Sequence, residues 1–264
     1  MSRPLMALLT DFGTADHYVG TMKGVALGIC PELTLVDITH DIPPHDVRAG
    51  ARQLAASYKY FPAGTVFLAV VDPGVGSGRR GLAVETADYR FVAPDNGLLS
   101  AVLDETPARR VVELTERKFA RPTISRTFEG RDRFAPAAAY LARGIAIASL
   151  GRSIKDYQTI DLPRPVVSAQ ELSGEVLRVD RFGNLITNID RRSFEQFAGG
   201  GSIAVFVGGQ EIPRLVATYA EAPAGQLCAL FGSTDHLEVA VNAGDAAATL
   251  KLARGAAAQV RLVS

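Results

Sequence analysis

Short apolar runs alternate with amphipathic segments along the N-terminal part of the chain. The apolar runs predict strands at residues 4–10, 33–38, 65–72, 81–86 and 90–94, and the amphipathic segments predict helices at residues 17–30 and 46–61. Residues 65–72 read TVFLAVVD, a run typical of a strand buried on both faces of a sheet. Asp46 stands where the second helix needs an N-cap. The alternation predicts an α/β domain with a mostly parallel sheet.

The pattern changes near residue 162. Residues 162–167 (LPRPVV) predict a linker, because proline cannot continue a helix. Strand-like segments separated by glycines follow at residues 174–180, 184–189, 202–209, 226–232, 236–241 and 258–263. We therefore expect two domains, an α/β domain over residues 1–162 and a small all-β barrel or sandwich over residues 163–264.

Composition narrows the possible partners. The chain has 264 residues and is 47% hydrophobic, which is enough for one large core or two modest ones. Basic and acidic residues balance at 28 each, which argues against nucleic acid or anionic lipid and favours a small neutral or zwitterionic ligand. No uncharged apolar run is long enough to span a membrane, so we expect a cytoplasmic protein. Cys30 and Cys228 form no CxxC pair, and we expect buried thiols.

Acidic side chains follow the first three predicted strands, at the sheet edge where α/β folds bind ligands. They are Asp11, Asp16, Asp37, Asp41 and Asp72. Each one alone is also an ordinary turn or cap residue. The loop DPGVGSGRRG lacks the Gly-Lys-Ser/Thr ending of a phosphate loop and precedes a strand rather than a helix. It does place Arg79 shortly after Asp72, a pair that fits a structural salt bridge as well as catalysis.

The histidines show no zinc-enzyme spacing, and no GxSxG nucleophile motif occurs. The loop DITHDIPPHD offers His40, Asp41, His45 and Asp46 as metal ligands, and a metal-dependent phosphoesterase would be the corresponding function. Its two prolines favour a rigid connector instead. We expect no metal site.

A second group of polar residues occurs in the segment VDRFGNLITNI of the C-terminal half. An aspartate for an ammonium group, an amide for a base edge and a ring for stacking would suit a nucleoside that carries an amino acid. Asp180, Asn184 and Phe182 supply these groups. The same residue types are equally typical of a hairpin turn.

Six segments together resemble one family. In chain order they are LLTDFGTADHYVGTMKG, VVDPGVGSGRRGLAVET, FVAPDNGLL, TFEGRDRFAPAAA, VLRVDRFGNLITNI and GSTDHLEVAVNAG. They are similar to the motifs of the S-adenosyl-L-methionine hydroxide adenosyltransferases, whose halide-using relatives are the fluorinases and chlorinases. The resemblance implies an α/β domain followed by a small C-terminal β-barrel. It also implies a homotrimer that binds S-adenosyl-L-methionine, without a cofactor or metal, between the N-terminal domain of one subunit and the C-terminal domain of the next.

The resemblance further implies roles for individual residues. Asp11 should hold the two ribose hydroxyls of the substrate. Asp180 should meet the methionine ammonium and Ser233 the carboxylate. The adenine should be surrounded by Phe182, Asn184, Asn242 and Ala243.

Catalysis in the hydrolases of this family uses an Asp-Arg-His set that positions a water molecule. Asp72 and Arg79 match the first two members, but Glu129 in TFEG stands where those hydrolases have histidine. The halide-using relatives carry tyrosine at the positions of Asp72 and Glu129, and the fluorinase has hydroxyl groups at those of Val75 and Gly130. Two carboxylates would repel a halide but accept both protons of water. The fluorinase also has a long insertion where this chain has only the short turn ADY.

We therefore predict hydrolysis of S-adenosyl-L-methionine to adenosine and L-methionine, by in-line attack of water on the ribose C5′. Glu129 and Asp72 would orient the water and take its proton, while Arg79 clamps both carboxylates and keeps them ionised. The alternative functions are a non-catalytic protein that binds S-adenosylmethionine or adenosine and, less favoured, a halogenase.

A structural interpretation of Glu129 competes with this catalytic one. Glu129 could cap the helix expected to begin near Asp132, or pair with Arg131 or Arg133.

Overall fold

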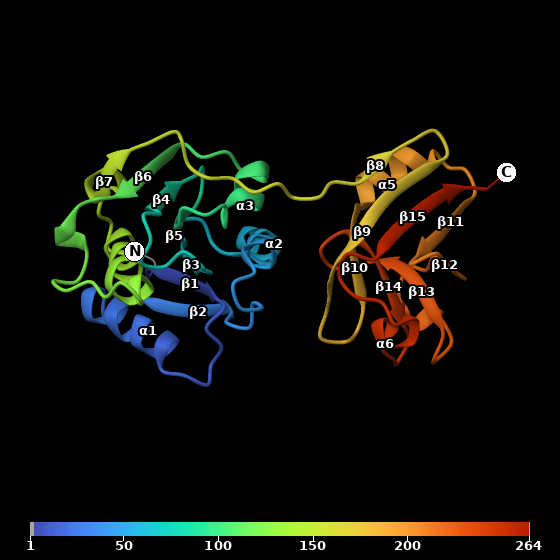
Figure 1. The fold of residues 1–264 in the computed structure, drawn as a ribbon, viewed down its shortest axis with the longest axis horizontal. Coiled ribbons are helices and arrows are strands. Elements are labelled where there is room, and N and C mark those ends of the chain that lie inside the picture. The colour runs from blue at the N-terminus through green and yellow to red at the C-terminus, as the bar shows by residue number, and fades with distance from the viewer. Residues whose placement is uncertain (1–2, 264) are drawn as a thin grey trace. The chain divides into compact units, whose positions relative to one another are not determined.

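The computed structural model describes residues 3–263, which fold into two compact units (Figure 1). The units divide between Leu162 and Pro163. Each unit packs its own apolar core.

A seven-stranded sheet forms the centre of the N-terminal unit. Its strands are β1 (Leu5–Thr10), β2 (Thr34–Thr39), β3 (Val66–Val70), β4 (Gly81–Glu85), β5 (Arg90–Pro94), β6 (Arg110–Leu114) and β7 (Gly151–Ser153), in the order β2-β1-β3-β5-β4-β6-β7. The first four in this order pair in parallel, and the remaining pairings are antiparallel. Only β4 and β7 therefore oppose the common strand direction, which confirms the predicted α/β fold with a mostly parallel sheet.

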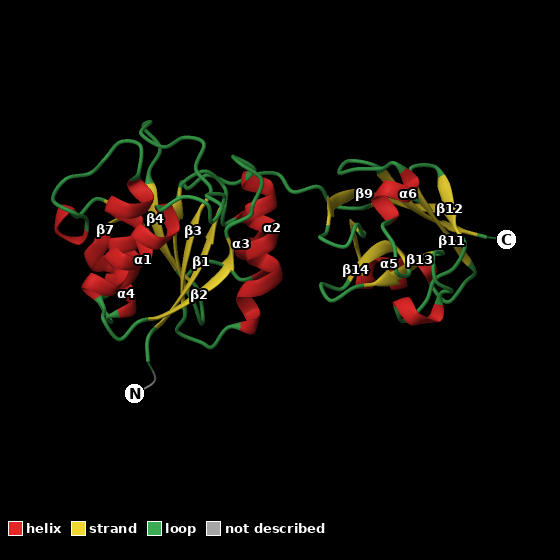
Figure 2. Ribbon diagram, turned by 90° about the horizontal axis from the view of Figure 1, so that it is seen from below, coloured by secondary structure: helices red, strands yellow, loops and turns green. Residues whose placement is uncertain are grey.

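Helices cover both faces of this sheet (Figure 2). They are α1 (Tyr18–Ile29), α2 (Val47–Ser57), α3 (Ser100–Glu105) and α4 (Ala135–Ala142). Leu8 packs in a cluster with Met22 of α1 and with α4, whereas the next residue, Leu9, packs with Leu54 of α2 and with α3. Successive strand residues point to opposite faces, so a strand covered on both sides must be apolar throughout.

The helices α2 and α4 begin in different ways: a side chain caps the first, and a π-helical turn precedes the second. Asp46 caps α2 as predicted, since its Oδ1 accepts a hydrogen bond from the backbone N–H of Ala49 at 2.9 Å. The helix expected near Asp132 instead begins with a π-helical turn over Gly130–Phe134, and α4 continues from it. π-helical turns of this kind are frequent at functional sites.

An antiparallel sheet forms the C-terminal unit and nearly closes into a barrel. Its strands are β8 (Val166–Val167), β9 (Glu171–Val179), β10 (Leu185–Asp190), β11 (Ile203–Val207), β12 (Gln210–Ile212), β13 (Leu227–Phe231), β14 (His236–Val241) and β15 (Ala257–Leu262). The chain after β12 reaches β13, because Val216 N–H donates to Ala229 O and Ala229 N–H donates to Arg214 O, both at 2.9 Å. These bonds link the two ends of the strand order, and the barrel expectation is confirmed.

Two features of this unit differ from the sequence expectation. Val166 and Val167 belong to β8, which pairs with β9, so the linker prediction is wrong for these two residues. Two short helices, α5 (Arg191–Ala198) and α6 (Ala246–Leu250), accompany the barrel, and the unit is therefore not purely β.

The segment that leaves the N-terminal unit is fastened to the sheet by Arg80. Its Nε donates to Asp95 Oδ2 at 2.7 Å, and its Nη1 donates to Asp156 Oδ1 at 3.0 Å. The N–H of Gln158 donates to the other Asp95 oxygen at 2.7 Å. Asp95 is buried and fully engaged, so this arrangement is structural.

None of the helices formed within residues 3–263 combines the length and the apolar character that a membrane crossing requires.

We expect Gly81→Ala to destabilise the N-terminal unit. A Cβ at this first residue of β4 would lie 2.5 Å from Phe134 Cε1 and 3.4 Å from Leu114 Cδ1. Overpacking of this kind costs about 1–3 kcal/mol, which corresponds to a fall of roughly 2–10 °C in the Tm measured by calorimetry.

Gly24→Ala is the matched control, because a Cβ there, in the middle of α1, meets nothing within 4 Å. It should raise the stability by up to about 1 kcal/mol through helix propensity. A Gly81→Ala protein that melts no lower than Gly24→Ala would contradict the expected clash.

Candidate active site

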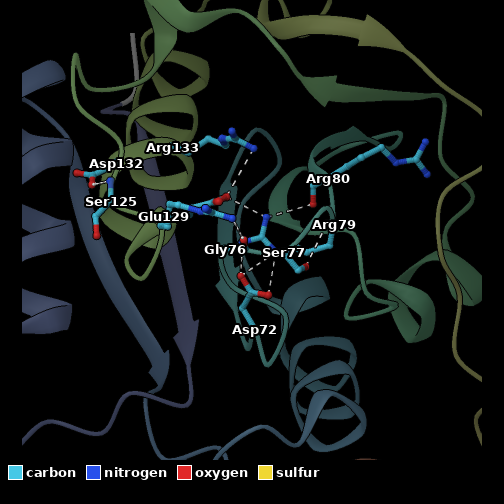
Figure 3. Close-up of polar contacts among 10 residues, drawn as sticks. Asp72, Gly76, Ser77, Arg79, Arg80, Ser125, Glu129, Asp132 and Arg133 are labelled. Carbon is cyan, nitrogen blue, oxygen red and sulfur yellow. Dashed lines mark hydrogen bonds and ion pairs between the residues drawn. The ribbon is translucent and has the colours of Figure 1, made fainter.

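Asp72, Arg79 and Glu129 lie together in the N-terminal unit (Figure 3). Arg79 Nε donates to both Asp72 carboxylate oxygens at 2.9 Å, and Nη2 donates to Oδ2 as well. Arg79 Nη1 donates to Glu129 Oε2 at 2.9 Å. One guanidinium thus binds two carboxylates that come from separate loops.

These three side chains are charged and almost inaccessible to water. Their exposed fractions are 5% for Asp72, 9% for Arg79 and 10% for Glu129. Burial alone would lower the pKa of the Arg79 guanidinium, but the hydrogen bond and charge of Asp72, followed by those of Glu129, raise it above its ordinary value. The guanidinium also lies over the ring of Phe134, with Cζ 5.0 Å from the ring centroid. Arg79 therefore stays cationic and, together with Arg133 at 3.5 Å from Glu129, offsets the charge of the buried carboxylates.

Close contact between two loops creates this arrangement. Asp72 follows β3, and the loop after it turns at Gly76, which has a φ of +77°. A Cβ at Gly76 would lie 2.4 Å from the carbonyl oxygen of Arg126, just before Glu129 in the chain. Arg126 Nη2 in turn donates to Gly76 O at 3.0 Å. Glycine is thus required at position 76, both for its left-handed backbone and for this close approach.

The contacts of Glu129 decide between its structural interpretations. Its side chain makes no hydrogen bond to the turn that follows, so the capping interpretation is wrong. It does pair with Arg133, whose Nη1 is 3.5 Å from Oε2, whereas Arg131 Nε binds Asp132 at 2.7 Å. Among the residues that the structure describes, every polar contact of Glu129 uses Oε2. Oε1 is left as a free acceptor beside Arg79.

Asp132, close to Glu129 in the chain, has a structural role. It is fully buried and accepts hydrogen bonds from Arg131 and, at 2.8 Å, from the backbone N–H of Ser125. Burial would raise the pKa of Asp132, but these two partners outweigh burial and lower it. Asp132 holds the loop before Glu129 against the π-helical turn.

The loops after β1 and β2 fix Asp11. Asp11 Oδ2 accepts a hydrogen bond from the N–H of His45 at 2.8 Å, and His45 has a φ of +68°. Gly13 N–H donates to the carbonyl of His40 at 2.8 Å, and the His40 ring lies 2.8 Å from Thr10 Oγ1 through Nδ1. Within residues 3–263, Asp11 Oδ1 has no protein partner. Asp11 is thus immobilised through one oxygen while the other can accept a ligand hydroxyl.

The other acids expected at this edge of the sheet take different roles, and Asp37 lies within β2 rather than after it. Asp37 forms an ion pair with Lys23 at 2.6 Å, and its Oδ1 lies 3.0 Å from His40 Nε2. Burial would raise the pKa of Asp37, but these two partners lower it. Asp16 and Asp41 are exposed. In the described part of the chain, no three His, Cys, Asp or Glu side chains are grouped as a metal site.

All six residues expected on the C-terminal side line one cavity of about 1060 Å³ within the barrel unit. They are Asp180, Phe182, Asn184, Ser233, Asn242 and Ala243. Pockets of this size and mixed lining hold ligands of the size of a nucleoside.

The turn at one end of this cavity is built by Asp180. Its Oδ1 accepts the N–H groups of Phe182 at 2.8 Å and Asn184 at 2.9 Å, and its Oδ2 accepts Asn184 Nδ2 at 3.1 Å. The hairpin-turn interpretation is therefore confirmed. It leaves the Phe182 ring 76% exposed, so the ring can still contact a ligand.

Sequence patterns did not single out Glu238 and Tyr219, which line the same cavity and hydrogen-bond to each other. The available signal was a charged residue in the apolar strand HLEVAV, where Leu237 and Val239 occupy the core face and Glu238 the opposite face. The sequence indicates Arg133 only as a partner of Glu129 at the helical i,i+4 spacing, and the structure confirms this contact.

Comparison with known proteins gives consistent matches over the two units. Residues 6–151 match the family model described as the SAM hydroxide adenosyltransferase N-terminal domain, and residues 174–259 match that of the C-terminal domain.

Relatives of known name fall into two groups. The (R)-S-adenosyl-L-methionine hydrolase of Salinispora tropica is 40% identical over 268 residues, covering 96% of this chain and 95% of the relative. The hydrolase of the same name from Thermus thermophilus is 40% identical over 255 residues, covering 94% and 95%. A fluorinase from Nocardia brasiliensis is 30% identical over 293 residues, covering 98% and 97%.

A solved structure is also similar along nearly the full length. It is an uncharacterized conserved protein from Thermotoga maritima, with a TM-score of 0.92 and 36% identity, covering 97% of this chain and 99% of that one.

Arg79→Met should lower the free energy of unfolding by about 3–5 kcal/mol, because it removes the cation that hydrogen-bonds both buried carboxylates. Within residues 3–263, only Arg133, 3.5 Å from Glu129, would remain beside them. Denaturant unfolding at fixed pH measures the loss.

Arg110→Met, at an exposed position on β6, serves as the control. Arg79→Lys should recover only part of the loss, since one ammonium cannot make the forked contacts of a guanidinium. Equal stability of the Arg79→Met and Arg110→Met proteins would show that the two carboxylates do not need the cation.

Proposed function

This chain belongs to the SAM hydroxide adenosyltransferase family, and we propose that it hydrolyses S-adenosyl-L-methionine to adenosine and L-methionine. The observation that carries the proposal is the pair of carboxylates, Asp72 and Glu129, held on the Arg79 guanidinium. The hydrolase names of relatives that are 40% identical over nearly their whole length support it.

The reaction is an in-line displacement at the ribose C5′. The oxygen of a water molecule forms a bond to C5′ while the C5′–S bond breaks. The electron pair of the C5′–S bond goes to sulfur, which becomes the neutral thioether of methionine. The leaving group needs no proton. The only proton to be moved is that of the attacking water, so the protein must place the water and accept that proton.

The buried carboxylates suit water better than a halide. A carboxylate oxygen only accepts hydrogen bonds, whereas a halide requires donors, and water offers two O–H donors. Arg79 directs its donors at the carboxylates themselves. In this proposal Glu129 accepts a water hydrogen through Oε1, Asp72 assists in orienting the water, and Arg79 clamps both groups. Positioning supplies roughly 7–11 kcal/mol of the barrier reduction, and the base a smaller share.

Substrate binding is assigned to two groups of residues. Asp11 of the N-terminal unit would hold the ribose hydroxyls through its unengaged oxygen. In the barrel cavity, Asp180 would bind the methionine ammonium and Ser233 its carboxylate. The adenine would contact Phe182, Asn184, Asn242 and Ala243.

We propose that the substrate lies between the N-terminal unit of one subunit and the C-terminal unit of the next in a homotrimer, as the resemblance to the family implies. No cofactor takes part, and neither nucleic acid nor a membrane is a partner. Cys30 and Cys228 are free and buried, which supports a location in the reducing cytoplasm.

Incubation with S-adenosyl-L-methionine in ¹⁸O-labelled water, with and without chloride, tests the reaction. Mass spectrometry should find adenosine labelled at its 5′ oxygen, an equal amount of methionine, and no chlorinated nucleoside. Tight binding without turnover would indicate a binding protein instead, and a 5′-chloro product would indicate a halogenase. Either result refutes the proposed hydrolysis.

Glu129→Gln should lower kcat roughly a hundred-fold or more if Glu129 takes the proton of the water. The amide keeps an acceptor for Arg79 but cannot be protonated at neutral pH. Glu129→His, which restores the residue of the family hydrolases, should retain much more activity than Glu129→Gln.

Glu32→Gln is the control, since Glu32 is exposed in the turn after α1. If kcat in Glu129→Gln stays within about two-fold of the Glu32→Gln value, Glu129 has no part in proton transfer.

A further inference from the structure

A single acidic residue occupies the floor of the barrel cavity. Glu238 on β14 lies opposite Ile186 of β10 and opposite Leu230 of β13, and directly paired residues share one face of a sheet. All three line the cavity. The floor is thus an apolar surface on three adjacent strands with a carboxyl at its centre.

This carboxyl is buried but only partly satisfied. Glu238 is 5% exposed, and within the described residues its one hydrogen bond comes from the Tyr219 hydroxyl to Oε1. Its Oε2 packs on the backbone of Gly232, where a Cβ would lie 2.1 Å away. A carboxylate can accept about four hydrogen bonds, so a buried one with a single partner is costly unless a ligand compensates it.

The charges around the cavity have an acidic excess. Among the residues that the structure describes, Asp180, Glu238 and Asp245 line it together with one cation, Arg178. The carboxylates of Asp180 and Asp245 accept hydrogen bonds from backbone N–H groups of the turns in which they lie. Glu238 lies in a strand and accepts no such bond, and it is the most buried of the three acids. Its charge is therefore the least screened by water and acts most strongly on a ligand in the cavity.

We propose that Glu238 is a specificity-determining residue, whose buried negative charge makes this cavity prefer a cationic sulfonium substrate to the uncharged thioether of the same shape. The inference rests on the proposed function, because it takes S-adenosyl-L-methionine as the ligand. Hydrolysis converts the charged sulfonium to an uncharged thioether. The attraction of Glu238 for the sulfur centre is then lost, which weakens product binding and favours product release.

The preference should depend on pH. Burial raises the pKa of the Glu238 carboxyl; the Tyr219 hydrogen bond and Arg178 oppose this shift, and Asp180 adds to it. As the pH falls through this raised pKa the carboxyl becomes neutral, and its attraction for the sulfonium is lost. Burial also raises the pKa of the Tyr219 hydroxyl and of the Cys228 thiol, so these two neighbours stay neutral as the pH falls.

The test compares the Kd of S-adenosyl-L-methionine with that of S-adenosyl-L-homocysteine, its uncharged thioether, by calorimetry. All proteins carry Glu129→Gln to slow turnover. With Glu238 intact, the sulfonium should bind about ten-fold more tightly at pH 8, as expected for one unit charge at a distance of several ångströms. Glu238→Gln should reduce this ratio towards one, and acidification should reduce it only in the protein that retains Glu238.

Tyr219→Phe separates charge from structure, because it removes the hydroxyl and keeps the carboxyl. It should weaken both ligands equally and preserve the ratio. A Glu238→Gln protein that binds both ligands with an unchanged ratio overturns the proposal, as does a ratio that collapses equally in Tyr219→Phe. Since binding is measured rather than turnover, these outcomes are independent of the ¹⁸O experiment: ligands that bind without being hydrolysed refute the proposed function alone.

Discussion

The Arg79 guanidinium binds two buried carboxylates, and the remaining features of the N-terminal site are arranged around this contact. The cation lets the two carboxylates lie close together in a nearly dry site, where a buried charge without a partner is costly. The surrounding residues keep the guanidinium in place. Phe134 lies under it, and Gly81 leaves the space that the Phe134 ring requires. The fold thus supplies and holds the cation that both carboxylates contact.

The division of the chain into two units corresponds to a division of chemical tasks in the proposed function. The N-terminal loops supply acceptors for a nucleophile, whereas the barrel supplies a large cavity with aromatic, amide and acidic groups. Displacement at a sulfonium needs no acid for the leaving group, so the catalytic residues can be few. Recognition of a substrate with a base, a ribose and an amino acid requires many contacts, which explains why most of the assigned residues lie in the cavity.

Several local features follow from the sequence because they depend on neighbouring residues. The apolar run before Asp72 predicts a strand buried on both faces. Asp46 caps α2 by accepting a hydrogen bond from the N–H of Ala49, three residues later. Other features fail at the same level of reasoning. Glu129 has the position of a helix cap, but a distant arginine binds its carboxylate, and the following residues form a π-helical turn. Val166 and Val167 follow a proline, and their pairing with β9 is a contact with a later segment.

The sequence by itself determined an α/β unit followed by a β-rich unit and the position of Asp72 at a strand end, because periodicity and turn chemistry act over a few residues. The strand pattern left a barrel and a sandwich open, and only the family resemblance implied the barrel. Only the tertiary structure decided which partner each charged group has. Arg79 could have paired with Asp72 alone, and Glu238 could have faced solvent from its strand. Loop contact at Gly76 and strand pairing across β10, β14 and β13 fix these choices. Burial makes these pairings energetically important, because a buried charge without a partner is costly. The partner comes from whichever segment the fold brings beside it.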